Sequence, residues 1–368
     1  MLPLNTDATP SGIPYKWKVL ISVVFGIFMV ILDTTVVNVA FQTLRTEFRA
    51  GINDSQWIIS IYVLALGIST PLSGFLADRF GIKRIYLTGL TTFLIGSLLS
   101  GLAPGLWFLV GSRALQGIGG GIAIPLGSAM LFAAFPPAEQ GLALGVFGIA
   151  LLVAPAVGPI LGGLLVDQHL WRWIFFINIP VGILGLTLAT RFLRERRSPR
   201  APALNPVSIA TSVVGFGAVL YAASIAADHG WTSGPVLLWF GIGFASLALF
   251  AVNELFRAAS PLLNLRLFAR RNFLRASLVG YVSVLALFGA EFLMPVYLQA
   301  LRGRTALDTG LILLPLAITA GITMPIAGRL YDIIGPRSLL TAGFAVLMFN
   351  TWQFSQITAD TSIRWLLF

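Results

Sequence analysis

The sequence predicts an all-α protein that crosses a membrane many times. Of its 368 residues, 57% are hydrophobic and only 10% are charged, whereas about a quarter of the residues in soluble domains are charged. The apolar residues gather into runs of roughly 20, the length at which a helix crosses about 30 Å of hydrocarbon. Such a chain lacks the polar residues that cover a water-facing surface. A soluble enzyme, a secreted domain and a disordered chain are therefore excluded.

Eleven apolar runs follow one another along the chain. The expected spans are residues 18–41, 56–76, 85–104, 106–134, 141–165, 173–193, 206–226, 234–254, 274–300, 309–330 and 338–356. A twelfth run begins near Ile363, but the six residues from there to Phe368 are too few to cross a bilayer. We therefore expect a chain that is incomplete at its C-terminus. The polar N-terminal segment lacks the basic flank of a signal peptide, so the first span is expected to be retained.

The basic residues predict the orientation of the spans. If the N-terminus is cytoplasmic, 17 of the 24 Lys and Arg residues lie in cytoplasmic segments, 6 lie in outer segments and Arg113 lies within a span. Membrane proteins show this excess of basic residues on the cytoplasmic side. We therefore expect a multi-pass protein of the cell membrane, whose net charge of +10 faces the lipid bilayer and not a nucleic acid.

The residue inventory argues against an enzyme or a cofactor protein. The sequence has no cysteine and 2 histidines, which excludes disulfide scaffolds and Cys-ligated metal or haem sites and leaves little room for a His-ligated metal. The glycines over 117–121 lie within a span and are followed by no P-loop lysine, so ATP is not expected to drive the protein. We expect no metal and no cofactor, and a driving force from an ion gradient or from the substrate's own gradient.

Two loops repeat the pattern G-x-L-x-D-x-x-G-x-[KR]. One copy is Gly74–Arg84 and the other is Gly328–Arg337, and each lies in a tight cytoplasmic turn between two expected spans. The copies are eight spans apart, so two extra spans separate two six-span halves, and completing the second half takes about 100 further residues. The expected parts are an N-terminal bundle (1–193), linkers with two extra spans (194–273) and an incomplete C-terminal bundle (274–368).

Each loop residue has a physical reason. We expect Gly74 to allow close helix approach and Gly81 to allow a sharp reversal. Asp78 can accept hydrogen bonds from the N-terminus of a neighbouring helix, and Lys83 and Arg84 anchor the next span at the anionic leaflet. The loops are expected to control the conformational cycle and not substrate binding. The second copy repeats the pattern with Gly328, Asp332, Gly335 and Arg337.

With these loops the sequence resembles the major facilitator superfamily and, within it, the fourteen-span drug:proton antiporters of the EmrB/QacA type. Arg113–Gly119 is similar to the R-x-x-Q-G-x-G motif of span 4, and Gly148–Gly163 is similar to the antiporter G-P-x-x-G-G motif of span 5. Leu32–Ala40 resembles a drug-exporter motif in span 1, and Trp171–Pro180 resembles the start of span 6 in that group. The resemblance implies two helical bundles and alternating-access exchange of a small-molecule substrate for protons.

Three ionisable residues, Asp33, Arg113 and Glu291, lie inside expected spans, where charge is costly and is usually functional. Asp33 and Glu291 each lie about 24 Å along the first helix of their half by helical rise, and Arg113 lies near the level of Asp33. A buried carboxylate that alternates between protonated and ionised forms can exchange a proton for a cation. Alternatively, Asp33 and Arg113 form a structural clamp and Glu291 lies in an outer vestibule.

Two further groups of residues complete the candidate site. Polar and aromatic residues that could line a cavity, or make interhelical contacts instead, are Asn38, Tyr62, Gln116 and Phe288. Residues expected to pack and bend span 5 are Pro155, Gly158, Pro159, Gly162 and Gly163.

The leading hypothesis is proton-coupled efflux of lipophilic, often cationic, drugs. The alternatives are a transporter for a specific metabolite or siderophore, and a receptor or scaffold that uses the same fold without transport. The buried acids disfavour a scaffold, because it gains nothing from burying them at such cost.

Overall fold

In the computed structural model of the protein, residues 13–197, 205–257, 261–303 and 305–356 are described, and their regular elements are all helical. The α-helices are α1 (Tyr15–Glu47), α2 (Ile52–Phe80), α3 (Ile82–Gly101), α4 (Leu106–Ala134), α5 (Gln140–Asp167), α6 (Trp173–Phe176), α7 (Asn178–Phe192), α8 (Pro206–His229), α9 (Gly234–Val252), α10 (Arg271–Val296), α11 (Ala306–Ile334) and α12 (Pro336–Phe354). Short turns are η1 (Pro137–Glu139), η2 (Asn253–Arg257), η3 (Leu265–Ala269) and η4 (Tyr297–Leu301).

Helices stand at all eleven predicted positions, the sixth being divided into α6 and α7 around Ile177. Within the described ranges, nine helical segments are long and apolar enough to cross a membrane. Helices α10 and α12 are not in that group of nine. Polar residues shorten the apolar part of α12, which carries Asn350, Thr351 and Gln353 near its end. The run predicted from Ile363 lies outside the described residues.

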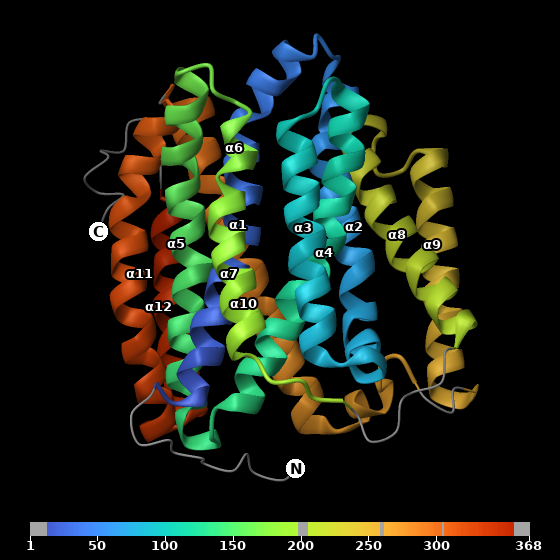
Figure 1. The fold of residues 1–368 in the computed structure, drawn as a ribbon, viewed down its shortest axis with the longest axis vertical. Helices are drawn as coiled ribbons and strands as arrows, with labels where there is room; N and C mark the ends of the chain where they lie inside the picture. The colour runs from blue at the N-terminus through green and yellow to red at the C-terminus, as the bar shows by residue number, and fades with distance from the viewer. Residues whose placement is uncertain (1–12, 198–204, 258–260, 304, 357–368) are drawn as a thin grey trace.

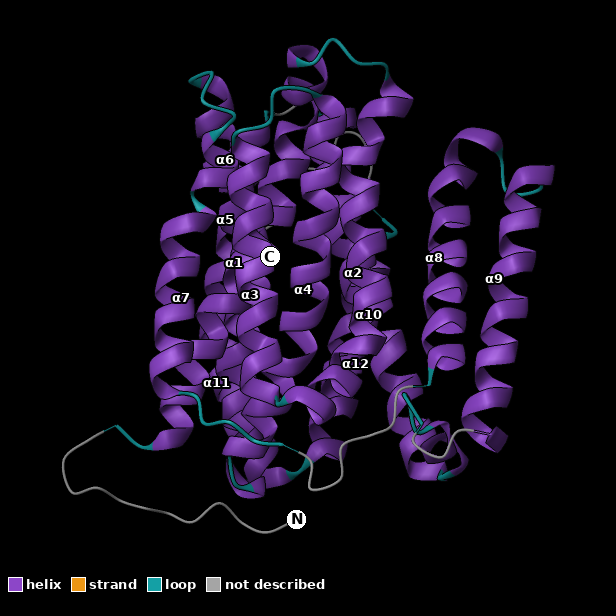
Figure 2. Cartoon of the chain, turned by 45° about the vertical axis from the view of Figure 1, so that its right-hand side comes forward, coloured by secondary structure: helices purple, strands orange, loops and turns teal. Residues whose placement is uncertain are grey.

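The helices form a main bundle with a separate pair beside it. Figures 1 and 2 show α8 and α9 standing together next to α2, away from α5, α11 and α12. The pair is attached through α8, where the ring of Tyr221 stacks on Trp57 of α2 at 5.8 Å and Ser224 Oγ donates to Ser60 Oγ at 2.9 Å. Helices α8 and α9 therefore extend the bundle of α1–α7 on its α2 side.

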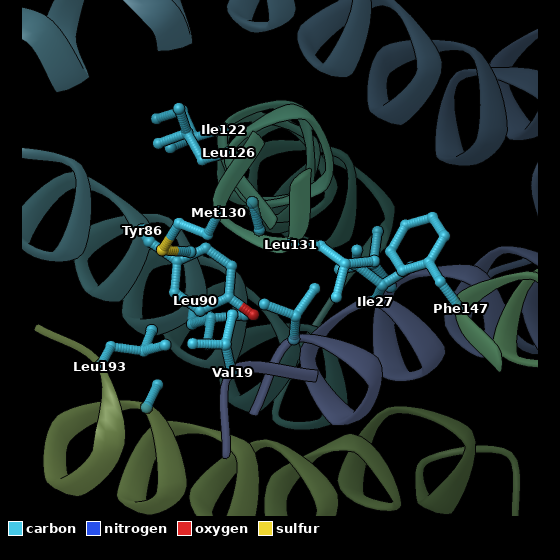
Figure 3. Packing of buried hydrophobic residues seen from close by; sticks show 14 of the residues in the cluster. Val19, Ile27, Tyr86, Leu90, Ile122, Leu126, Met130, Leu131, Phe147 and Leu193 are labelled. Atoms are coloured by element: carbon cyan, nitrogen blue, oxygen red, sulfur yellow. The ribbon is translucent and has the colours of Figure 1, made fainter. Parts of the chain in front are cut away.

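Apolar packing holds α1–α7 together in two layers. The first cluster joins the early part of α1 to α3, α4 and α7, and Figure 3 shows Val19, Ile27, Tyr86, Leu90 and Met130 within it. The second cluster joins the later part of α1 to α4 and α6 through residues such as Leu109 and Phe175. On α1 the first cluster extends to Val30 and the second begins at Leu32.

Both repeated loops turn through a glycine in the left-handed region. Gly81 has φ +104° and Gly335 has φ +81°, a conformation that residues with a Cβ rarely adopt. Each glycine ends one helix and is followed directly by the next helix. The predicted reversals at Gly81 and Gly335 are confirmed.

The N-terminus of α3 is capped from the segment that follows α7. The Glu195 carboxylate accepts hydrogen bonds from the backbone N–H groups of Lys83 and Arg84, both at 3.1 Å. Lys83 Nζ donates to the Thr190 carbonyl at 2.7 Å. These contacts tie the reversal at Gly81 to the end of α7.

We expect Glu195→Ala to lower the free energy of unfolding by about 0.5–2 kcal/mol, the usual effect of losing a helix cap. The two amides of α3 lose their acceptor, while the apolar clusters are untouched. Thermal unfolding in detergent measures the change. Glu195→Gln is the matched control, since its amide oxygen still accepts, and it should retain part of the stability. A loss in the Gln variant as large as in the Ala variant would contradict capping by hydrogen bonds.

Candidate functional site

The centre of the site is an ion pair enclosed inside the α1–α7 bundle. Arg113 of α4 and Asp33 of α1 are 1% and 0% exposed, and the Arg113 guanidinium donates to an Asp33 carboxylate oxygen. Arg113 Nε also donates to the Ile58 carbonyl at 3.2 Å, and its guanidinium lies 4.1 Å from the centroid of the Tyr62 ring. The structure thus brings together two residues for which the helical rise predicts similar depths in the membrane.

Two amide side chains complete the surroundings of the carboxylate. Gln116 Nε2 donates to Asp33 Oδ1 at 3.0 Å, and Gln116 Oε1 accepts from Arg113 at 2.9 Å and from Ser100 Oγ at 3.2 Å. Asn178 Nδ2 donates to Asp33 Oδ1 at 2.7 Å. Asp33 therefore accepts hydrogen bonds from α4 and from the first residue of α7.

We call Asp33, Tyr62, Ser97, Ser100, Arg113, Gln116 and Asn178 the polar layer; each is at most 1% exposed. The layer lies between the two apolar clusters. On α4, Leu109 and Val110 belong to the second cluster and Ile122 to the first, with Arg113 and Gln116 between them. Charges in such an environment interact strongly with neighbouring groups, because little solvent screens them. The ion pair is therefore an internal feature of the bundle.

The other predicted residues of this region divide by exposure. Tyr62 and Gln116, considered as cavity-lining residues, lie in the polar layer and make interhelical contacts there. Asn38, which follows Asp33 on α1, is exposed. Phe288 and Glu291 lie in α10, and their side chains are outside the described part of the structure.

Sequence reasoning missed Asn178, Ser97 and Ser100. Small polar residues are common in membrane helices, where a hydroxyl often bonds to its own backbone, so the two serines gave no signal. Asn178 is part of the Trp171–Pro180 motif, and that motif is the sequence feature that could have identified it as a site residue. Only the packing of α3 and α7 against α1 places these groups around Asp33.

A further buried acid, Glu254, was also missed. Its side chain is 3% exposed in the turn after α9, where it accepts from Ser208 Oγ of α8 and, at 2.9 Å, from the Leu263 backbone N–H. Asn253 Nδ2 donates to the same Ser208 hydroxyl at 2.7 Å. The span predicted over residues 234–254 ends at Glu254, and acids at the ends of spans are normally solvated. Here it connects α8, α9 and the following linker.

The second repeated loop contacts the N-terminus of α5. Asp332 of α11 accepts from the backbone N–H groups of Gly141 at 2.9 Å and Leu142 at 3.1 Å, a favourable position for a negative charge. Asp78, the equivalent residue of the first loop, is exposed, and within the described ranges no backbone amide donates to it. The contact predicted for Asp78 is thus found at its counterpart Asp332.

Close helix approach is likewise found in one copy only. A Cβ on Gly328 would lie 2.2 Å from the Gly141 carbonyl oxygen, whereas a Cβ on Gly74 would have no atom within 4 Å. The expectation of close packing at Gly74 is therefore wrong for the described chain, because no helix lies against that face of α2. Arg337, at the start of α12, is exposed.

The residues of span 5 pack α5 against α1. A Cβ on Gly158 would lie 2.0 Å from Thr35 Oγ1, and one on Gly162 would lie 3.1 Å from Val39 Cβ. Gly163 is buried as well. Pro155 and Pro159 lie inside α5 without ending it. Helix α5 therefore contacts α1 through its later glycines and α11 through its first turn.

Comparison with known proteins agrees with these features. The model of the Major Facilitator Superfamily matches residues 23–368. The MFS-type transporter YhcA of Bacillus subtilis is 38% identical over 344 residues, which are 94% of this chain and 64% of YhcA. The chain thus spans just under two thirds of that relative.

Several relatives carry resistance names, and two of them serve as examples. Lincomycin resistance protein LmrB of Bacillus subtilis is 31% identical over 96% of this chain and 74% of LmrB. Fatty acid resistance protein FarB of Neisseria gonorrhoeae is 34% identical over 96% of this chain and 69% of FarB.

A solved structure, that of a point mutant of peptide transporter POT in complex with sulfate, shares the fold. Its TM-score is 0.51 with 18% identity, covering 84% of this chain and 68% of that chain. The helical architecture, the repeated loops and the matched family model lead to one conclusion. The chain belongs to the Major Facilitator Superfamily and is a multi-pass membrane protein.

Proposed function

We propose that the protein exports lipophilic, often cationic, compounds in exchange for protons by alternating access. The observation that carries the proposal is Asp33, an acid enclosed with Arg113 between two apolar clusters. Ionisable residues inside membrane spans are rare and usually functional, and a carboxyl group that takes up and releases a proton can couple transport to a proton gradient. The resistance names of LmrB and FarB support export, and FarB supports lipophilic cargo.

The ion pair can be coupled to helix movement through α5. Protonation of Asp33 removes the charge that holds Arg113, so the attraction between α1 and α4 weakens. Thr35, two residues from Asp33, contacts Gly158 of α5 and donates to the Ala154 carbonyl at 3.4 Å. The first turn of α5 is held by Asp332 of α11. A change at Asp33 thus has a short route to the contact between the two bundles.

The repeated loops are proposed as conformational elements. Asp332 accepts hydrogen bonds from the N-terminus of α5, so releasing it would remove this polar contact between α5 and α11. We assign Asp78 the same role toward a helix outside the described chain, because the two loops share one pattern. The basic residues of these loops support a cytoplasmic location for the loops and for the N-terminus.

We expect Asp33→Asn to abolish substrate-driven proton release, because an amide does not carry the exchanged proton. The measurement uses full-length protein in proteoliposomes, a lipophilic cation such as tetraphenylphosphonium as substrate, and an entrapped pH indicator. Asp54→Asn is the matched control, since Asp54 is exposed near the start of α2 and should exchange as wild type. Unchanged exchange by the Asp33 variant would exclude Asp33 as the proton site. Proton release with a specific metabolite and with no lipophilic compound would favour the narrower transporter.

A further inference from the structure

We infer that the Asn178 amide oxygen accepts a hydrogen bond from the Asp33 carboxyl group when that group is protonated, and that a half-turn of the Asn178 amide accompanies each change of protonation. The inference deepens the proposed function and rests on it. It implies that the hydrogen bonds at the junction of α6 and α7 change with the protonation of Asp33. The argument begins from one buried oxygen atom.

Asn178 Oδ1 is a buried acceptor to which no residue in the described ranges donates a hydrogen bond. Asn178 itself is 0% exposed, and both hydrogens of its Nδ2 are used, one on Asp33 Oδ1 at 2.7 Å and one on Ser97 Oγ at 3.0 Å. Protein interiors pair the great majority of such atoms, and each exception calls for an explanation. Here the unpaired acceptor belongs to the same amide group that already contacts the carboxylate.

Protonation changes what Asp33 needs from its neighbours. An ionised carboxylate only accepts hydrogen bonds, whereas a protonated one also donates and requires an acceptor. Arg113 offers no acceptor. Gln116 Oε1 already accepts twice, from Arg113 at 2.9 Å and from Ser100 at 3.2 Å. Asn178 Oδ1, in contrast, accepts no hydrogen bond from any described residue.

A half-turn of the amide about Cβ–Cγ exchanges the places of Nδ2 and Oδ1. The proton that arrives from solvent then lies on Asp33 Oδ1 and is donated to Asn178 Oδ1, and no other covalent bond changes. The Ser97 hydroxyl now donates to Oδ1, so it leaves the Phe175 carbonyl to which it donates at 2.9 Å in this structure. Phe175 is in α6 and Asn178 begins α7. Protonation of Asp33 therefore changes hydrogen bonds on both sides of the break between these helices.

The surroundings supply few other titrating groups. Arg113 from α4 faces Asp33 directly, and Tyr62 from α2 lies against Arg113. Within the described residues, α3, α5, α6 and α7 contribute no charged group to the polar layer. The amide of Asn178 is therefore the neighbour whose donor and acceptor can exchange while the ion pair with Arg113 changes.

Infrared difference spectra between acidic and alkaline pH test the inference on the protein in lipid. A carboxylic C=O band that disappears in Asp33→Asn belongs to Asp33. We expect Asn178→Leu to shift this band to higher wavenumber, because the O–H group loses its acceptor. Asn253→Leu is the matched control, a buried asparagine on the α8–α9 pair, and should leave the band in place.

Isotope-labelled asparagine gives a second readout that needs no change at position 178. The labelled amide band missing from Asn178→Leu should move with pH in the wild type and stay fixed in Asp33→Asn. An Asp33 band unchanged in Asn178→Leu, or an Asn178 band that ignores pH, would overturn the inference while leaving Asp33 as the proton site. A spectrum without any Asp33-dependent carboxyl band would instead overturn the proposed proton site, and this inference with it.

Discussion

Replacing Arg113 by methionine should destabilise the protein by about 3–5 kcal/mol, the usual cost of breaking a buried ion pair by removing one partner. Methionine fills a similar volume and keeps the apolar contacts, so the loss is electrostatic. The Asp33 carboxylate would remain 0% exposed without its counter-charge. Gln116 Oε1 and the Ile58 carbonyl would also lose a donor.

The matched control removes the other charge as well. In Asp33→Asn/Arg113→Met, the asparagine oxygen can still accept from Gln116 and Asn178, and no charge is left unpaired. Chemical unfolding in detergent should therefore show the double variant to be more stable than Arg113→Met alone. The double-mutant cycle isolates the coupling between the two residues. Additive losses in the cycle would mean that the pair contributes no interaction of its own, and the polar layer would then be a set of independent hydrogen bonds.

Much of the fold could be predicted because membrane helices follow one strong rule. The hydrocarbon core demands apolar runs of about 20 residues with internally bonded backbones, and helices stand at each predicted run. The turns at Gly81 and Gly335 were predictable since a glycine at a fixed place in a repeated pattern indicates a special backbone conformation. Asp33 and Arg113 were found because charge inside a span is rare.

The rest of the site depended on information that one sequence does not carry. Asn178 and Ser97 are uncharged, and nothing in their spacing indicates which face of α3 or α7 meets α1. Glu254 appeared to end a span in solvent, whereas the chain turns once more after α9 and encloses it. The repeat predicted equal roles for Asp78 and Asp332, but a role of this kind requires a neighbouring helix, and α5 lies against only one of the two loops.

That contact between α5 and α11 is among the tightest in the described structure. The Gly328 and Gly141 backbones face each other, so a Cβ on either would lie 2.2–2.3 Å from the carbonyl oxygen of the other. One turn further, a Cβ on Gly145 would lie 2.4 Å from the Met324 carbonyl oxygen. The obstructing atoms are backbone atoms, which cannot move aside as a flexible side chain can. Small residues at such crossings let two helices pack closely within a membrane.

We expect Gly328→Ala to push α11 away from α5 and to cost about 1–3 kcal/mol, the range for overpacking a close contact. The shift also withdraws Asp332 from the Gly141 and Leu142 amides. Because the sequence has no cysteine, spin labels at Ala138→Cys and Ile333→Cys report the separation of α5 and α11 directly, and this separation should increase.

Gly74→Ala is the matched control in the other copy of the loop. Its Cβ meets no atom, so the better helix propensity of alanine should stabilise α2 by roughly 0.5–1 kcal/mol. Equal effects of the two substitutions would show that the helix contact at Gly328 does not set the spacing of α5 and α11.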